Sequence, residues 1–507
     1  MIMMIETKRR HFKMQKISGK LRLVELTDVI VYLIQLILSI ILILLFKKIL
    51  PEKYVILIVC VLAFIWIILV GVSIALTRKN CKAGDIQKKR KLKNIKLAFQ
   101  IVSIVISVFL AIGCALTNEG LNTINNIANV SYQTQVVSVV VKNDSEHKRI
   151  AGLNEETIGV IEKLDFENTE KALKEIETVE NTSLEPVYYA SAGELAAALL
   201  DESVEAVMFN EAYRGLLEDV NADFTTKTKI IYQYQIQEEL EIETPDVNIS
   251  YEPFNVYISG IDTYGPVSSV SRSDVNMVIT VNPETKKILM TSIPRDYYVE
   301  LASFGALDKL THAGIYGVEE SMKTLENLFG IEIDYYARVN FTSLVTMVDA
   351  LGGITVDNPQ AFESYHTHDV YPQGKINMDG EAALEFVRER YGLSGGDNDR
   401  VKNQQRVLAA MIDKAISPAI IKNYSSILNA VSESVMTNMS SEDIQKLIQM
   451  QSNEMSPWTI EQISVIGTGS TSSTCYSSPG YELYVMEPNY SSVNMASEKI
   501  VNTESGQ

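Results

Sequence analysis

The stretch that decides the fold of the larger domain spans residues 271–296 and reads SRSDVNMVITVNPETKKILMTSIPRD. Val275–Val281 and Ile288–Ser292 are short, apolar, β-branched runs, which predict two strands. Pro294 cannot donate to a strand ladder, so the second strand is expected to end there. Arg295 then lies at the carboxyl end of a strand, where α/β folds bind their ligands.

Charged residues are spaced in pairs around these strands. Arg272 and Asp274 are two residues apart as the chain enters the first strand, so they are expected to share one strand face. A cross-strand ion pair is the alternative reading of that spacing. Arg388 and Arg390 are expected to share a face of a strand at Glu385–Arg390, after a helix that starts at Gly380–Leu384. Two adjacent arginines repel each other, so this second pair favours an anion between them.

A helix is expected at Asn398–Ile416, with Asp397 or Asn398 as its cap. Arg400 and Gln404 are four residues apart, which places them on one face of its first turns. The free N–H groups of a helix N-terminus also favour phosphate. The sequence thus predicts an anion site in this segment.

Asp262 follows the strand expected at Phe254–Gly260 and is the second acidic residue of the predicted site, with Asp274. Magnesium takes one or two protein carboxylates and fills its other positions with water and phosphate oxygens. Arginine offers paired, planar donors that match those oxygens. Two carboxylates beside several arginines therefore suit Mg²⁺ on a pyrophosphate, with Mn²⁺ as an alternative ion.

Three apolar runs precede this domain: Val29–Phe46, Tyr54–Leu76 and Leu97–Leu116. Each approaches the roughly 20 residues that a helix needs to cross a bilayer. Three transmembrane helices are therefore expected within residues 29–117. A cleavable signal peptide is not expected, because two further spans follow the first.

Charge predicts the orientation of these helices. Residues 1–117 contain 19 Lys and Arg residues against five acidic ones, gathered in the N-terminus (1–28) and the loop at 77–96. The positive-inside rule places both in the cytoplasm, and everything after about residue 117 outside the cell. The full chain has a net charge of −18, so the outer part is strongly acidic. An acidic domain repels nucleic acid, which is not expected as a partner.

The outer part is expected to consist of two α/β domains. Residues 118–130 resemble a polar stalk, 131–240 a small accessory α/β domain, 241–253 an acidic linker, 254–490 the larger domain and 491–507 a tail. In the small domain, helices are expected at Glu155–Lys163, Thr169–Glu177 and Ala192–Leu200, and strands at Gln135–Val141, Val187–Tyr189, Val204–Phe209 and Lys229–Gln237. In the larger domain, helices are expected at Gly317–Leu328, Phe341–Leu351, Ile420–Val435 and Ser441–Met450, and strands at Tyr335–Asn340, Gln462–Gly467 and Glu482–Met486.

Several of these segments, in this order, resemble the LytR–CpsA–Psr family of envelope phosphotransferases, over a motif core at 254–416. The motifs that carry the resemblance are Arg272-Ser273-Asp274, Ser292-Ile293-Pro294-Arg295-Asp296, Asp349-Ala350-Leu351-Gly352-Gly353, Val387-Arg388-Glu389-Arg390 and Asp397 to Gln405. The three spans and the accessory domain resemble its capsule-type branch. The accessory domain is also similar to one named after DNA polymerase processivity. The resemblance implies an α/β/α catalytic domain around a central mixed sheet.

The resemblance also implies roles for individual residues. Asp262 and Asp274 would hold the metal. Arg272, Asp274, Arg295, Arg388 and Arg390 would be catalytic. Pyrophosphate would be bound by Arg272, Arg295, Lys309, Arg388, Arg390, Arg400 and Gln404.

The implied function is transfer of a glycopolymer, capsular or teichoic-acid-like, from a polyprenyl-pyrophosphate carrier to peptidoglycan at the outer face of a Gram-positive cell membrane. Capsule-synthesis proteins are further partners that it suggests. Two alternatives share the same residues: a non-catalytic polyprenyl-phosphate receptor that regulates capsule synthesis, and a lipid pyrophosphatase. A histidine pair, His366 and His368, is interpreted as a solvated turn and not as a metal site.

Overall fold

A computed structural model gives the structure of the 507-residue chain. It describes residues 26–128, 132–240, 245, 247–261, 266–417, 424–454 and 456–507. Asp262 therefore lies outside the described residues. The chain divides into two compact units, one with the N-terminal helices and residues 445–454, and the other with residues 124–444 and 455–507.

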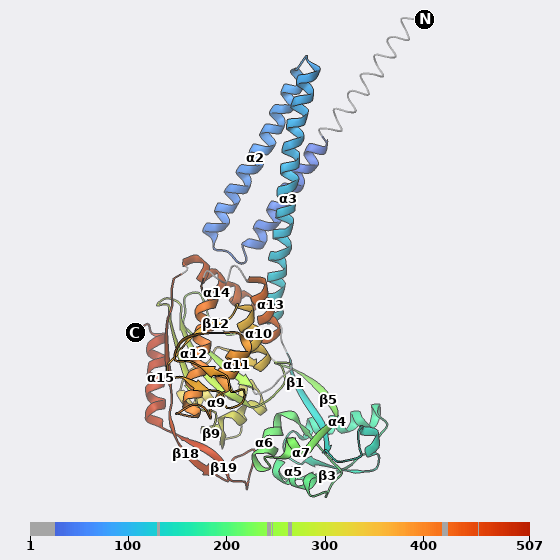
Figure 1. Ribbon diagram of the computed structural model, residues 1–507, viewed down its shortest axis with the longest axis vertical. Coiled ribbons are helices and arrows are strands. Elements are labelled where there is room, and N and C mark those ends of the chain that lie inside the picture. The colour runs from blue at the N-terminus through green and yellow to red at the C-terminus, as the bar shows by residue number, and fades with distance from the viewer. Residues whose placement is uncertain are drawn as a thin grey trace. The chain divides into compact units, whose positions relative to one another are not determined.

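Three long apolar helices form the N-terminal unit (Figure 1). They are Leu26–Phe46, α2 (Glu52–Lys82) and α3 (Ile86–Ala128), and each is long and apolar enough to cross a membrane. This confirms the three expected spans. Helix α3 continues to residue 128, so the expected stalk is helical over its described part.

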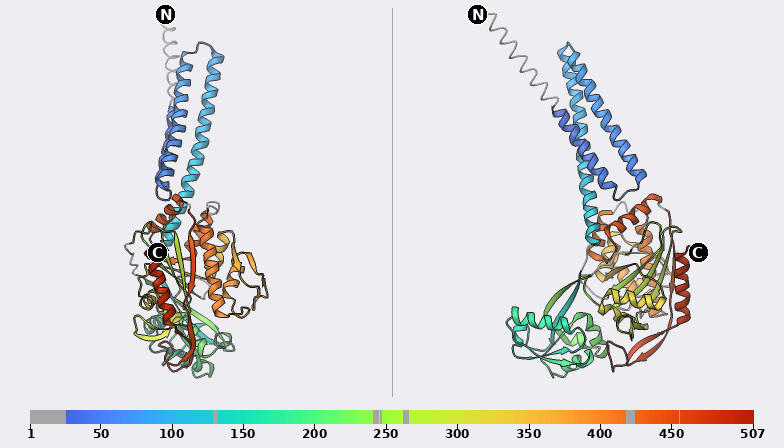
Figure 2. Two further views of the ribbon diagram at one scale, coloured as in Figure 1. Left: turned by 90° about the vertical axis from the view of Figure 1, so that its left-hand side faces the viewer. Right: turned by 180° about the vertical axis from the view of Figure 1, so that it is seen from behind.

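The accessory domain is a five-stranded sheet with helices packed on it (green in Figure 2). Its strands, in the spatial order β3-β2-β4-β1-β5, are β3 (Glu185–Tyr189), β2 (Thr157–Ile161), β4 (Ala206–Asn210), β1 (Tyr132–Lys142) and β5 (Thr228–Glu239). Its helices are α4 (Phe166–Val179), α5 (Ala192–Leu200), α6 (Arg214–Val220) and α7 (Phe224–Lys227), with 3-10 turns at Ile150–Leu153 and Glu211–Tyr213. One expected helix, Glu155–Lys163, is wrong: its residues include the buried strand β2, whose run Ile158 to Ile161 lies inside the sheet.

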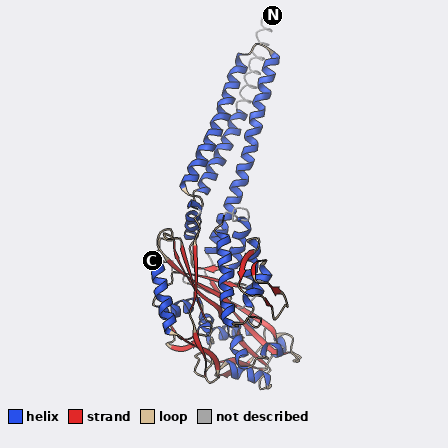
Figure 3. Cartoon of the chain, turned by 60° about the vertical axis from the view of Figure 1, so that its left-hand side comes forward, coloured by secondary structure: helices blue, strands red, loops and turns tan. Residues whose placement is uncertain are grey.

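The larger domain is built on a six-stranded mixed sheet (strands in Figure 3). Its strands, in the spatial order β16-β11-β6-β7-β8-β17, are β16 (Met436–Thr437), β11 (Tyr335–Asn340), β6 (Phe254–Ile261), β7 (Ser273–Asn282), β8 (Lys287–Ile293) and β17 (Thr459–Ser464). The pairs β11–β6 and β17–β8 are parallel, and the others are antiparallel.

Helices cover both faces of this sheet, which confirms the expected α/β/α architecture. On one face, Val278 and Leu289 share a buried cluster with residues of α9 (Val318–Phe329) and α15 (Tyr490–Glu504). On the other face, Met277 and Ile279 pack with α12 (Asp397–Ala415). Alternate residues of β7 thus face opposite layers, as the two-residue period of a strand requires.

Shorter elements follow along the chain. They are β9 (Tyr298–Leu301), β10 (Ala306–Lys309), α8 (Leu310–Ala313), a 3-10 turn (Gly314–Tyr316), α10 (Phe341–Ala350), β12 (Ile354–Asn358), β13 (Phe362–Glu363), β14 (Val370–Tyr371), β15 (Gly374–Met378), α11 (Gly380–Arg388), α13 (Tyr424–Ser434), α14 (Ser441–Glu454), β18 (Gly467–Ser472) and β19 (Leu483–Pro488). Residues 445–454 of α14, the last helix before β17, belong to the N-terminal unit.

The expected strand at Glu385–Arg390 is wrong. Helix α11 starts behind Asp379, whose side chain accepts a hydrogen bond from the Ala382 N–H, and it continues to Arg388. Ala383 and Phe386 are three residues apart and both fully buried, so the helical period governs this segment. Glu389 then leaves the helix with extended backbone.

The expected tail at 491–507 contains helix α15. Val493, Ala496 and Ile500 are buried in the same cluster as α9, at a spacing of three and four residues. The larger domain therefore extends beyond residue 490.

Candidate functional site

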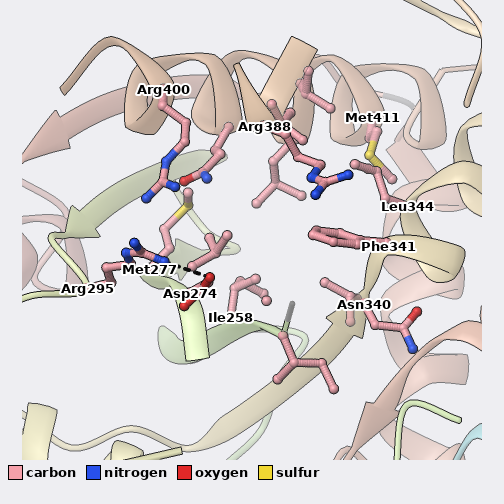
Figure 4. A pocket seen from close by; sticks show the side chains of 18 of the residues that line it. Ile258, Asp274, Met277, Arg295, Asn340, Phe341, Leu344, Arg388, Arg400 and Met411 are labelled. Atoms are coloured by element: carbon pink, nitrogen blue, oxygen red, sulfur yellow. Dashed lines mark hydrogen bonds and ion pairs between the residues drawn. The ribbon is translucent and has the colours of Figure 1, made fainter. Parts of the chain in front are cut away.

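A cavity of about 450 Å³ lies between the sheet and helices α10, α11 and α12. Charged residues line one part of it, and apolar side chains line the other. Figure 4 shows Arg295, Arg400 and Asp274 on one side, with Phe341, Leu344 and Met411 on the other. The predicted site residues at its wall are Asp274, Arg295, Arg388, Arg390, Arg400 and Gln404.

Asp274 and Arg295 form the ion pair at the charged side of the cavity. Arg295 Nη1 lies 2.8 Å from Asp274 Oδ2, and the Thr311 hydroxyl donates to Oδ1 at 3.1 Å. Burial raises the pKa of Asp274, but the charges of Arg295, Arg272 and Arg400 outweigh it, so the pKa lies below its usual value. Asp274 is therefore ionised at neutral pH.

Arg400 approaches the same region from the first turn of α12. Its Nη2 lies 2.7 Å from Asp397 Oδ1, while its Nε is buried without a hydrogen-bond partner among the described residues. The Nε of Arg295 is in the same state. Buried donors without partners are costly, so both are suited to an anionic ligand. Asp397 does not cap the helix, whose N-cap is Gly396, but pairs with Arg400 instead.

Arg388 and Arg390 reach the cavity from the end of α11, not from a strand face. The Arg388 guanidinium lies 4.4 Å from the centre of the Phe341 ring, and Arg390 donates to the Tyr391 hydroxyl at 2.5 Å. Neither is paired with a carboxylate in the part of the chain that the structure describes. Two cations without acidic partners at one cavity favour a ligand with more than one negative charge.

Arg272 is not among the residues that line the cavity, although its charge is one of those that lower the pKa of Asp274. It directly precedes β7, whose pairing with β6 has a register shift between Gly260 and Ile261. Arg272 Nη1 lies 3.7 Å from Asp219 Oδ1 of the accessory domain. Its guanidinium also packs directly on Gly215, where a Cβ would lie 2.1 Å from Arg272 Cζ.

Lys309 also lies outside the cavity wall. Its Nζ lies 2.9 Å from Asp296 Oδ1, and Asp296 Oδ2 is 3.7 Å from Arg295 Nε. Asp296 thus lies between Lys309 and Arg295. The remaining predicted residue, Asp262, follows Ile261, which lines the cavity.

Sequence reasoning missed several residues of this site. Phe341 and Tyr391 line the cavity, but nothing in their spacing separates them from core aromatics. His366 lies in an exposed turn, as predicted, and also lines the cavity, while His368 is exposed and 3.0 Å from Glu363. Among the described residues, no group of three or more His, Cys, Asp and Glu side chains could hold a metal ion.

Replacing Gly215 with alanine is expected to release Arg272 from Asp219. The new Cβ displaces the end of a flexible side chain, and alanine is favoured over glycine in a helix by about 1 kcal/mol, so Tm should change little. The Arg272 guanidinium would then no longer be fixed near Asp274, whose pKa it lowers, and we expect the activity of the site to fall about fivefold, as for a lost interaction of roughly 1 kcal/mol. Asp219→Asn should have the same effect. Full activity in both variants would contradict this role.

Comparison with known proteins decides the family. The sequence model described as the LytR_cpsA_psr family matches residues 220–492, more than half of the chain. The chain belongs to this family. The model of the DNA polymerase processivity factor matches residues 89–209.

Relatives within the LytR_cpsA_psr family carry transferase names. An Enterococcus faecalis protein named polyisoprenyl-teichoic acid–peptidoglycan teichoic acid transferase TagU is 40% identical over 199 residues, or 39% of this chain and 65% of that protein. A Bacillus cereus protein of the same name is 34% identical over 212 residues, or 41% of this chain and 67% of that protein. The match thus spans about two thirds of each relative.

Solved structures of similar proteins include B. subtilis TagV, which is 29% identical, with 50% of this chain and 97% of TagV covered and a TM-score of 0.42. A structure of TagT bound to LI-WTA is 26% identical, with 53% and 96% covered and a TM-score of 0.41.

Proposed function

We propose that the protein transfers a glycopolymer from a polyprenyl-pyrophosphate carrier to peptidoglycan. One observation carries the proposal: arginines without acidic partners lie in the same cavity as an apolar wall. A carrier of this kind joins a pyrophosphate to a long apolar chain, and both halves of the cavity match it. The transferase names of the relatives support the same chemistry. The polymer is either capsular polysaccharide or, as those names favour, a teichoic-acid-like polymer.

In the proposed reaction, a sugar hydroxyl of peptidoglycan attacks the phosphorus that bears the glycan. An O–P bond forms to the acceptor, and the P–O bond to the carrier phosphate breaks. Polyprenyl phosphate leaves, and the hydroxyl proton passes to solvent. Arg295, Arg388, Arg390 and Arg400 would bind the phosphate oxygens and neutralise charge as it develops, so catalysis would rest on positioning and electrostatics.

The carboxylate of Asp274 is suited to bind a magnesium ion. It is ionised, it lines the cavity, and each carboxylate oxygen retains a lone pair beyond its bond to Arg295 or Thr311. Asp274, together with Asp262, would hold Mg²⁺ or Mn²⁺. The ion would add positive charge at the phosphate oxygens.

We also propose that the N-terminus and the loop at 77–96 lie in the cytoplasm and that the two α/β domains lie outside the cell. The lysine and arginine distribution supports this orientation. Capsule-synthesis proteins would meet the chain at the membrane. Reporter fusions at residues 85 and 300 test the topology, and a cytoplasmic signal at residue 300 would contradict it.

Arg388→Ala is expected to abolish most of the transfer. The assay uses the full chain in detergent, a lipid-pyrophosphate glycan, peptidoglycan and Mg²⁺, and we expect a loss of about 10²-fold for one lost donor to developing charge. Arg149→Ala, an exposed arginine of the accessory domain, is the matched control. Transfer by Arg388→Ala at the wild-type rate would refute the site.

The products separate the proposal from its alternatives. Polymer on peptidoglycan supports a transferase, free glycan phosphate supports a pyrophosphatase, and unchanged lipid supports a non-catalytic receptor.

A further inference from the structure

Two exposed tyrosines lie together at the cavity. The side chains of Tyr365 and Tyr391 are 62% and 63% exposed, and their ring centroids are 5.1 Å apart. Tyr391 lines the cavity, and so does His366, whose ring meets Tyr365 edge-on at 5.4 Å. Paired aromatic rings that are left open to solvent beside a polar site commonly mark a binding surface.

A buried carboxylate holds the backbone beneath both tyrosines. Glu389 is 1% exposed, and it accepts hydrogen bonds from the N–H groups of Tyr365 at 2.7 Å, Arg390 at 2.8 Å and Gly392 at 2.7 Å. One side chain therefore ties the segment of Tyr365 to the segment of Tyr391. Bonds from N–H groups to a carboxylate are strong, so the two rings are presented on a fixed base.

Close packing of the two segments adds to this rigidity. A Cβ on Gly392 would lie 2.2 Å from the Glu363 carbonyl oxygen, so only glycine permits this approach of the two backbones. The exposure of the rings thus does not arise from a loose loop. The domain holds two aromatic side chains in solvent by a specific set of contacts.

The tyrosine pair is continuous with the arginines of the cavity. Arg390 donates to the Tyr391 hydroxyl at 2.5 Å, and its guanidinium lies 4.7 Å from the centre of that ring. Arg390 has no carboxylate partner among the described residues. A ligand group bonded directly to a phosphate held by Arg390 would therefore lie next to Tyr391.

We infer that Tyr365 and Tyr391 form a carbohydrate subsite that binds the first sugar of the lipid-linked donor. The inference rests on the proposed function, because this sugar is bonded to the pyrophosphate that the arginines would hold. A pyranose ring presents C–H groups on its faces and hydroxyls at its edge. Exposed tyrosines match both features, with ring faces for the C–H groups and hydroxyls and His366 for the edge. The partly buried Phe341 and Leu344 carry no polar group and suit the lipid instead.

The test compares two probes on the full chain in detergent: polyprenyl pyrophosphate alone, and the same lipid bearing one N-acetylglucosamine. Affinities are measured by calorimetry for wild type, Tyr365→Ala and Tyr391→Phe. Tyr365→Ala removes a ring without touching Arg390, and Tyr391→Phe keeps the ring but removes the hydroxyl. Tyr251→Ala, at a tyrosine that is 75% exposed in the segment that precedes the domain, is the matched control.

We expect Tyr365→Ala to bind the sugar-bearing lipid about five- to tenfold more weakly, the effect of one aromatic contact, and the bare lipid as wild type does. Tyr391→Phe should retain most of the affinity, and Tyr251→Ala all of it. Equal losses for both lipids, or no loss, would overturn the subsite. So would unchanged donor affinity with a raised KM for peptidoglycan, since the occupant would then be the acceptor. A wild-type protein that binds neither lipid would instead overturn the proposed function.

Discussion

Arg295→Ala is expected to lower the rate of polymer transfer by about 10²–10³-fold, the usual effect of removing one preorganised donor to developing charge. Arg295 is bonded to Asp274 at 2.8 Å, and its buried Nε has no hydrogen-bond partner among the described residues. The side chain therefore both fixes the carboxylate and retains a donor for the ligand. The loss should appear mainly in kcat, since the other arginines would still bind the substrate. Single-turnover transfer at saturating donor measures it.

Two controls separate this chemical role from a structural one. Arg295→Lys keeps the charge but not the planar pair of donors, so it should recover only part of the rate. Arg295→Ala should also raise the pKa of Asp274, because the first of the charges that lower it is gone. The activity of Arg295→Ala should then fall at a higher pH than that of wild type as the medium is acidified. A folded Arg295→Ala protein with near-normal kcat would remove Arg295 from the mechanism.

The central sheet could be predicted from the sequence because its strands are short apolar runs with a clear signal. The strands expected at Phe254–Gly260 and Tyr335–Asn340 correspond to β6 and β11. Helix α15 was not predicted, although Val493, Ala496 and Ile500 have helical spacing. The polar residues around these three conceal the pattern in the sequence.

The error at 385–390 has a physical cause. A stretch of six residues, four of them charged, is compatible with both periods, and tertiary packing decides between them. Here the burial of Phe386 with Ala383 selects the helix. The two arginines still reach one cavity, because Arg388 ends the helix and Arg390 follows its terminus.

The sequence predicts only in part which of the site residues lie together in the structure. Asp274 and Arg295 meet because their strands pair, which strand order makes plausible. The position of Arg272 depends on Asp219, a residue from another domain, and no local pattern contains that contact. The apolar wall has no sequence signal either, since Phe341 and Leu344 resemble ordinary core residues until a cavity is found beside them.

Asp308→Ala is expected to destabilise the larger domain by about 3–5 kcal/mol, the cost of leaving a buried charge without its partner. Asp308 is fully buried, and its Oδ1 accepts from the Lys309 N–H and from His312 Nδ1, both at 2.7 Å. Its Oδ2 accepts from the Ser477 N–H at 2.8 Å and from the Ser477 hydroxyl. Asp308 thus joins β10, α8 and the segment at Ser477. Chemical denaturation measures the loss, and Asp144→Ala, at a side chain that is 78% exposed, is the control.

The pH dependence of the stability lost in Asp308→Ala shows how much of that loss comes from the charges of Asp308 and His312. Burial raises the pKa of Asp308, but the charge of His312 and the hydrogen bonds from His312 and Ser477 lower it by more. The pKa of Asp308 therefore lies below its usual value of 3.8. The stabilisation that comes from the charge of Asp308 is present above about pH 4 and is lost as the pH falls through the folded-state pKa of Asp308. Burial lowers the pKa of His312, but Asp308 and Asp219 raise it above 6.5. The stabilisation that comes from the positive charge of His312 is complete below about pH 6.5 and is lost as the pH rises through the folded-state pKa of His312.

The difference in unfolding free energy between wild type and Asp308→Ala should therefore be largest between about pH 4 and 6.5 and should shrink on either side. It should not vanish, because the hydrogen bonds from the Ser477 and Lys309 N–H groups do not depend on the charge of His312. Transfer should weaken as well, since Thr311, next to His312, donates to Asp274. A difference that stays constant from pH 4 to pH 9 would mean that His312 is neutral in the folded protein, and the ion pair would then contribute only as a hydrogen bond.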